Sequence, residues 1–126
     1  MGEVLFTTAE ALEAARRAAD RRYLEFLRVP DLSAGLYVLE AGAADPQSPH
    51  DEDEFYVVMS GRGRFRAGAV TQEVGRGSVL FVPARLEHRF LDVQERLEVL
   101  VFFGPAEGSR SARAEPAPAG CTHELD

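Results

Sequence analysis

A series of short β-type segments between residues 23 and 104 is the feature that most restricts how this chain can fold. The segments are rich in valine, leucine, phenylalanine and tyrosine, and glycine, proline or polar residues separate them about every eight to twelve residues. Long helical patterns do not alternate with them, which argues against a doubly wound α/β fold. The pattern predicts an all-β protein whose antiparallel strands form a sandwich or barrel. The segments are residues 23–29, 35–42, 54–61, 63–68, 70–75, 78–84, 87–93 and 96–104.

The two ends of the chain differ from this central region. Residues 7–22 are rich in alanine, with Thr7 or Thr8 as N-cap and Glu10 near the third helical position, which predicts a surface-docked helix. The last part of the chain is rich in alanine, proline, glycine and serine, which is typical of a mobile or surface-draped tail. The predicted parts are an N-terminal helix (1–22), one β domain (23–104) and a flexible C-terminal tail (105–126).

Composition limits the partners and the location of the protein. A chain of 126 residues forms one domain, and its net charge of -7 argues against nucleic acid or an anionic membrane as the main partner. There is no signal-peptide-like start and no apolar run of membrane-spanning length, so we expect a cytoplasmic protein. Lysine, asparagine and isoleucine are absent, which indicates a GC-rich, bacterial genome. Cys121 is the single cysteine, and we expect neither it nor His123 in the tail to bind metal.

A histidine and a glutamate four residues apart, His50 and Glu54, precede a valine-rich segment. Pro49 and the β-branched and aromatic residues that follow indicate a strand and not a helix. Four residues of strand span about 13 Å, an awkward reach for two side chains that share one metal ion. The chain between them is therefore expected to bulge or turn, with residues 51–53 facing solvent and Glu54 facing inward. An exposed acidic turn with His50 as a bystander is the alternative, and this segment alone favours it.

A second arrangement of this kind follows a turn with two glycines. Pro83 ends an apolar strand, and His88 begins the next one. Alternation places His88, Phe90 and Asp92 on one face of that strand. The two histidines outside the tail thus both stand at the start of a strand, and a closed β-sandwich can bring such ends together at one mouth.

The spacing of these residues resembles the two sequence motifs of the cupin superfamily of small jelly-roll barrels. The motifs are G-x5-H-x-H-x3-E-x6-G and G-x5-P-x-G-x2-H-x3-N. The matching residues are Gly42, His50, Glu54 and Gly61 in the first motif and Gly77, Pro83 and His88 in the second. The departures are Ser48 for the first histidine, Arg85 for the glycine and Asp92 for the asparagine. The resemblance covers residues 23–104 and implies an all-β cupin jelly-roll barrel of two antiparallel sheets, to which the N-terminal α-helix is added.

The resemblance further implies that His50, Glu54 and His88 bind one divalent metal ion, and that Ser48 marks the position of a missing fourth ligand. Two imidazoles and one carboxylate leave coordination positions open for water, substrate or dioxygen, which suits non-haem Fe(II). Mn, Ni, Cu and Zn remain alternatives, because availability as well as affinity decides which metal is bound. A neutral serine hydroxyl is a poor ligand, so we expect Ser48 to hydrogen-bond a metal-bound water. A cupin barrel that has lost its metal is the alternative.

Aromatic side chains are expected to line the interior around a small-molecule ligand. If Glu54 faces inward, Tyr56 follows it on the same face, and Phe90 follows His88. Together with Ser48, these two aromatic residues are the predicted substrate-binding residues, with simple core filling as the alternative for each. Tyr37, Leu39 and Val58 are also expected to face inward, whereas Phe55 and Val57 are expected to face outward. The alternating residues Arg62, Arg64 and Arg66 are expected on a solvent face. Arg85 is expected either near an anionic substrate or in a surface salt bridge.

These expectations lead to two functional hypotheses. The first is a metal-dependent enzyme, with oxygenase chemistry on a small organic molecule as the leading type and Asp92 or Tyr56 as proton-transfer group. The second is a non-catalytic barrel that binds or senses a small ligand, and cupins also include sugar isomerases and epimerases. We also expect a homodimer, because sheet edges and outward residues such as Leu100 and Phe102 need covering, unless the N-terminal helix covers them.

Overall fold

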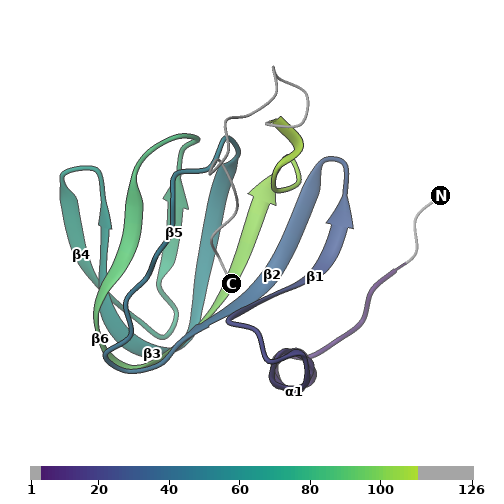
Figure 1. Ribbon diagram of the computed structural model, residues 1–126, viewed down its shortest axis with the longest axis horizontal. Helices are drawn as coiled ribbons and strands as arrows, with labels where there is room; N and C mark the ends of the chain where they lie inside the picture. Colours follow the sequence, from purple (N-terminus) through teal and green to yellow (C-terminus); the bar gives the residue numbers. More distant parts are fainter. Residues whose placement is uncertain (1–3, 111–126) are drawn as a thin grey trace.

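The computed structural model describes residues 4–110, in which one helix precedes six antiparallel strands (Figure 1). The elements are α1 (Ala9–Ala19), β1 (Tyr23–Val29), β2 (Leu32–Leu39), β3 (Asp53–Ala67), β4 (Val70–Gly75), β5 (Val79–Val82) and β6 (His88–Gly104). The strands follow the order β1-β2-β6-β3-β4 in one curved sheet, and β5 pairs with β3 outside this path. The predicted all-β jelly roll with an N-terminal helix is confirmed, although the sheet does not close on itself within the described residues.

The sequence predicts four short segments where the structure has two long strands, β3 and β6. Gly61 and residues 94–95 interrupt the β-type pattern, but they lie inside the strands and bend them. Gly61 has φ +97°, and a Cβ atom at this position would lie 2.0 Å from the carbonyl oxygen of Arg96. No residue with a side chain fits there, so this glycine allows the two bent strands to stay in contact.

The bend brings the two ends of the β3–β6 ladder toward each other. The strands pair along their whole length, from Asp53 opposite Gly104 to Ala67 opposite His88. Glu54 therefore lies at one end of the ladder and His88 at the other. Because the register shifts and the strands bend in the middle, the two side chains nevertheless meet.

The interior of the bent sheet is apolar and aromatic. Tyr56 and Phe90 are almost inaccessible to solvent and their ring centroids lie 5.6 Å apart, while Phe65 packs against Phe90 at 4.8 Å. Burial of each large side chain contributes about 2 kcal/mol to folding. The residues predicted to face inward are buried and those predicted to face outward are exposed or half-buried: Tyr37, Leu39, Tyr56 and Val58 inside, and Phe55, Val57, Arg62, Arg64 and Arg66 outside.

Helix α1 begins at the second of the two predicted caps. The side-chain oxygen of Thr8 accepts a hydrogen bond from the backbone N–H of Ala11 at 3.0 Å. The helix ends at Asp20, whose left-handed conformation, with φ +54°, terminates it before the predicted boundary at residue 22. No helix within residues 4–110 combines the length and apolar character needed to cross a membrane.

The helix covers part of the outer face of the sheet, below β1 and β2 in Figure 1. Leu12 is its buried residue and forms a cluster with Leu36 and Val38 of β2, against which the half-buried Leu100 of β6 packs. Both faces of β2 are consequently buried, one by the helix and the other by the aromatic interior. The half-buried Leu100 therefore packs against a cluster to which the helix contributes Leu12, which favours the alternative that the helix covers this outward residue.

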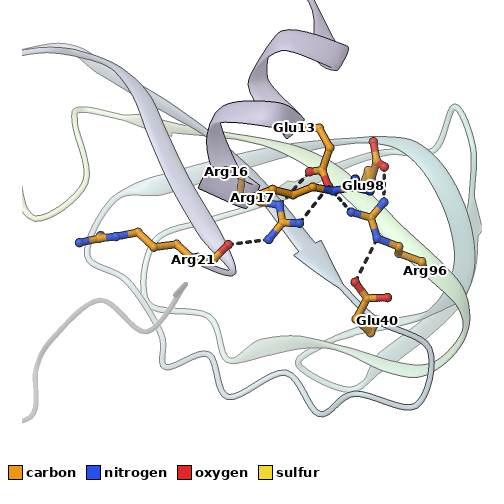
Figure 2. A network of polar contacts seen from close by, with 7 residues as sticks. All are labelled: Glu13, Arg16, Arg17, Arg21, Glu40, Arg96 and Glu98. Carbon is orange, nitrogen blue, oxygen red and sulfur yellow. Dashed lines mark hydrogen bonds and ion pairs between the residues drawn. The ribbon is translucent and has the colours of Figure 1, made fainter. Parts of the chain in front are cut away.

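A cluster of charged side chains also fixes α1 to the sheet (Figure 2). Glu13 of α1 accepts hydrogen bonds from Arg16 at 2.8 Å and Arg17 at 2.9 Å, and Arg96 of β6 bonds the same carboxylate. The hydrogen bond with Arg16 is the largest influence, and together with Arg17 and Arg96 it outweighs burial and lowers the pKa of Glu13 to about 2. The cluster consists of Glu13, Arg16, Arg17, Arg21, Glu40, Arg96 and Glu98.

Replacing Glu13 by glutamine is expected to lower the free energy of unfolding by about 1 kcal/mol at neutral pH, because solvent screens ion pairs near the surface. A carboxylate whose pKa falls on folding stabilises the protein above its unfolded pKa, here 4.5, and loses that contribution as the pH falls to about 2. Urea unfolding across this range should show the difference from wild type disappearing. Glu10→Gln, at an exposed residue of the same helix, is the control. An equal, pH-independent loss in both variants would contradict the role of Glu13.

An apolar patch remains exposed on the outer face of β3 and β5. The exposed fractions are 40% for Phe55, 58% for Val79 and 61% for Phe81. Phe55 and Phe81 are directly paired across the two strands, and the ring of Phe102 lies 6.3 Å from that of Phe55. A contiguous patch of this kind, next to a four-residue edge strand, is typical of an interaction surface.

We propose that a second copy of this chain covers the patch in a symmetric dimer, since one self-complementary surface can pair around a two-fold axis. Phe81→Glu is expected to convert the dimer to a monomer in sedimentation velocity at micromolar concentration. Val29→Glu, at a residue of β1 that is 46% exposed at the other end of the sheet, should leave the dimer intact. A monomeric wild type at that concentration would show the proposal to be wrong.

Candidate metal centre

Glu54 and His88, two of the three predicted metal ligands, are in direct contact. Glu54 Oε1 lies 2.9 Å from His88 Nε2, and each side chain is only 1% exposed. Glu54 stands at the start of β3 and His88 at the start of β6. The contact thus joins the two ends of the bent ladder at one buried point.

The second nitrogen of His88 determines which groups the ring can bind. His88 Nδ1 lies 2.7 Å from the carbonyl oxygen of Leu86, which can only accept a hydrogen bond, so Nδ1 carries a proton. Nε2 then faces two further acceptors, Glu54 Oε1 at 2.9 Å and Gln47 Oε1 at 3.2 Å. A neutral ring would place a lone pair against both oxygens. The contact between Nε2 and these two oxygens therefore requires either a second proton on His88 or another cation.

Burial and charge act on His88 in opposite directions. Burial alone lowers the pKa of the imidazole, whereas the hydrogen bond and the negative charge of Glu54 raise it, and the net effect is an increase. The surroundings thus favour positive charge next to Nε2. A proton supplies that charge, and so would a metal ion.

Tyr56 holds the carboxylate of Glu54. The hydroxyl oxygen of Tyr56 lies 2.8 Å from Glu54 Oε2 and 3.0 Å from Gln47 Oε1. Burial and the charge of Glu54 raise the pKa of Tyr56, so its hydroxyl remains protonated and donates. Tyr56 is therefore suited to orient the carboxylate.

Asp45 anchors this network to the aromatic interior. It accepts a hydrogen bond from the Gln47 amide at 2.6 Å, from the Tyr37 hydroxyl at 2.6 Å and from the backbone N–H of Phe90 at 2.8 Å. Neither Asp45 nor Gln47 is predicted from the sequence as a site residue, although both are only 4% exposed. They occupy positions that the first motif leaves unspecified, in a segment without strand structure to which alternation does not apply.

Ser48 and His50 do not share a strand face, because β3 begins only at Asp53. Alternation along a strand therefore does not determine the directions of these two side chains. Ser48 is half-buried, and Gln47 supplies the oxygen next to the Nε2 atom of His88.

His50 lies beside the Glu54–His88 pair with its side chain buried. Its ring centroid is 6.2 Å from that of His88 and 5.0 Å from that of Phe103. His50 Nδ1 lies 3.7 Å from Glu107 Oε2, and the backbone oxygen of His50 accepts a hydrogen bond from Arg85 at 2.7 Å. Within residues 4–110, no three His, Cys, Asp or Glu side chains form a ready-made metal cluster. His50, the third predicted ligand, is thus adjacent to Glu54 and His88 but does not form a three-ligand metal site with them in this structure.

The acidic turn between His50 and Glu54 is only partly as predicted. The chain bends at residues 51–52, as expected. The expected exposure is wrong for Glu52, which is 1% exposed and accepts a hydrogen bond from the backbone N–H of Arg110 at 3.0 Å. Contact with a later part of the chain, which local pattern does not reveal, explains this burial.

Asp92 points away from the site. Its left-handed backbone, with φ +49°, interrupts the alternation of β6, so the next residue, Val93, is buried instead. The side chain of Asp92 is 63% exposed and lies 3.5 Å from that of Arg64. The predictions that Asp92 shares a face with His88 and can serve as a proton-transfer group are therefore wrong.

Arg85 retains the backbone conformation of the glycine that it replaces, with φ +69°. Its side chain is 72% exposed and lies 3.4 Å from Asp51. Of the two alternatives for Arg85, the structure therefore favours the surface salt bridge.

Residues 105–110 follow β6 and pack beside the end of the sheet (Figure 1). The backbone N–H of Glu107 donates to Ser33 Oγ at 2.8 Å, and Arg28 donates to the backbone oxygen of Glu107 at 2.6 Å. For these six residues the structure agrees with a surface-draped tail and not with a mobile one. The remaining predicted tail, 111–126 with Cys121 and His123, lies outside the described residues. Burial, with the charges of Glu25 and Glu54, raises the pKa of Glu107 to about 8.

Comparisons with known proteins agree with the fold and the motifs. The family model of the cupin domain matches residues 35–103. An uncharacterized protein of Streptomyces coelicolor is 50% identical over 98 residues, which cover 78% of this chain and 93% of the relative. The structure of an RmlC-like cupin from Methanocaldococcus jannaschii has a TM-score of 0.67 at 13% identity and covers 90% of this chain and 98% of its own. An RmlC-like cupin from Shewanella frigidimarina has a TM-score of 0.62 at 19% identity over 67% and 75% of the two chains.

The two kinds of likeness carry different weight. The solved structures, at such low identity, show a shared fold. The family match over more than half of the chain, with a relative that has the same residue at half of the aligned positions, shows common descent. Together with the two motifs that meet at Glu54 and His88, these matches establish that the chain belongs to the cupin family.

Proposed function

We propose that this protein binds one divalent metal ion through His50, Glu54 and His88 and acts as a metal-dependent enzyme on a small organic molecule. The observation that carries the proposal is the meeting of His88 Nε2, Glu54 Oε1 and Gln47 Oε1 where a neutral imidazole has no proton to share. A cation satisfies all three atoms at once. The 2.9 Å between the first two matches two ligand atoms that each lie about 2.1 Å from one ion at a right angle.

The balance of buried charge supports a cation at this place. Four carboxyl groups are buried in the same domain as the two imidazoles, whereas every arginine within residues 4–110 is exposed or half-buried. Burying carboxylates together is costly unless positive charge or protons compensate them. A divalent ion would supply that compensation. The four residues are Asp45, Glu52, Glu54 and Glu107.

Two imidazoles and one carboxylate suit Fe(II) with open coordination positions, and the bound metal would supply Lewis-acid and oxygen chemistry, so we propose an oxygenase as the leading type. The residues of the chain position the ligands. Tyr56 orients the Glu54 carboxylate, and the carbonyl oxygen of Leu86 directs Nε2 of His88 toward it. Mn, Ni, Cu and Zn are the other candidate ions.

The substrate in this proposal lies against the aromatic interior. Phe90 packs between Tyr56 and Phe65 near the candidate ligands, and its backbone is fixed by Asp45. Such a wall favours a small, largely apolar molecule and excludes water from the site. Ser48, half-buried two residues before His50, is proposed to contact the substrate or a bound water.

His88→Ala is expected to lower the affinity for Zn²⁺ by more than about 100-fold, because loss of a ligand exceeds the effect of losing a residue that only supports one. Isothermal titration calorimetry with protein first treated with chelator would measure the change. His123→Ala removes a histidine from the predicted tail and is the matched control. Equal affinity in wild type and His88→Ala would place any bound metal elsewhere.

The enzymatic part of the proposal is tested by oxygen uptake. Wild type loaded with Fe(II) is expected to consume O₂ in catalytic excess over protein with at least one member of a panel of small organic acids, phenols and alcohols. His88→Ala should show only the background rate, because the ion is not retained. Saturable binding of a panel member without O₂ uptake would contradict the oxygenase and favour the binding module.

A further inference from the structure

Glu107 brings a carboxylate to the candidate metal centre from outside both cupin motifs. It follows the end of β6 and lies beyond the residues matched by the family model, 35–103. Its Oε2 atom is 3.7 Å from His50 Nδ1, and the side chains are 8% and 2% exposed. Glu107 thus lies next to a predicted metal ligand, although neither motif includes it.

The backbone around Glu107 is fixed on both sides. Its own N–H donates to Ser33 Oγ, and Arg28 donates to its carbonyl oxygen. Three residues later, the backbone N–H of Arg110 donates to the buried Glu52 carboxylate at 3.0 Å. These bonds join the segment to the β1–β2 hairpin and to the start of β3, so the direction of the Glu107 side chain is set by the fold.

An oxygen atom faces Nδ1 in both histidines, at 2.7 Å in His88 and at 3.7 Å in His50. In His88, the carbonyl oxygen of Leu86 engages Nδ1 and directs Nε2 toward Glu54. In His50, the carboxylate of Glu107 faces Nδ1, and Nε2 is buried on the other side of the ring. Metal-binding histidines usually donate their second N–H to a carboxylate or a carbonyl oxygen, which fixes the ring and increases its basicity.

We propose that Glu107 is the positioning residue for His50: it accepts the Nδ1–H of the ring, so that Nε2 serves as the third metal ligand. This inference rests on the proposed metal site. The present separation of 3.7 Å is longer than a hydrogen bond, so the proposal requires the two atoms to move closer when the metal binds. The segment of residues 105–110 is then part of the site, and metal binding and the docking of this segment stabilise each other.

Two replacements of Glu107 separate positioning from direct ligation. Glu107→Ala removes the acceptor and is expected to weaken Zn²⁺ binding by about 10- to 100-fold. Glu107→Gln retains an acceptor of the same size for Nδ1–H, so it should recover most of that loss, whereas a residue that bound the metal itself would not be rescued. Asp51→Asn removes the same charge near the mouth of the site, beside Arg85, and should leave the affinity unchanged.

Calorimetry with Zn²⁺ is paired with nitrogen-15 spectra of the histidine rings in the zinc-loaded protein. The wild type is expected to show a His50 ring protonated at Nδ1, with a slowly exchanging proton, and Glu107→Ala should accelerate that exchange at least about tenfold. Unchanged affinity and exchange in Glu107→Ala would overturn the inference while leaving the metal site in place. Equal losses in Glu107→Gln and Glu107→Ala would overturn the positioning role. A wild type that binds no Zn²⁺ would instead overturn the proposed function on which the inference rests.

Discussion

The close crossing of β3 and β6 at Gly61 is the constraint on which the rest of the structure depends. The positive φ of this residue and the 2.0 Å that would separate a Cβ atom from the Arg96 oxygen leave space for a hydrogen only. A larger residue would push the strands apart in the middle of their ladder. The ladder could then not bend sharply enough for Glu54 and His88, which lie at its opposite ends, to meet.

The aromatic interior and the polar network stabilise this bent form jointly. Phe90 illustrates the connection: its ring packs against Phe65 and Tyr56, while its backbone N–H bonds the buried Asp45. Asp45 therefore satisfies groups from three separate parts of the chain, and a buried network of this kind is stable only when each member has its partners. Packing and hydrogen bonding consequently specify the same arrangement of strands, so the position of the site follows from the core.

The sequence predicts those parts of the site that regular periodicity and family spacing determine. Alternation along a strand places Tyr56 and Val58 inside with Glu54, and motif spacing identifies His50 and His88. Alternation fails where the backbone is irregular, as at Asp92 with its positive φ, and in the segment that carries Gln47. It also cannot anticipate contacts between distant segments, which explain why Glu52 is buried and why residues 105–110 are ordered against the sheet. Likewise, Gly61 resembles the end of a strand in the sequence. Its role in the interior of β3 depends on the approach of β6, which is distant along the chain.

The nested pairing of β3 with β6 also has a consequence for the order in which the protein folds. Ala67 and His88 are the paired residues nearest to each other along the chain, and Asp53 and Gly104 are the most distant. Loop-closure entropy favours formation of the near pairs first, so the ladder zips from His88 toward Gly104. Glu54 therefore reaches His88 only in the last steps, and residues 105–110 dock after it. During synthesis the polar centre remains open to water until almost the whole β domain has left the ribosome, so the buried carboxylates are desolvated only once their partners are in place.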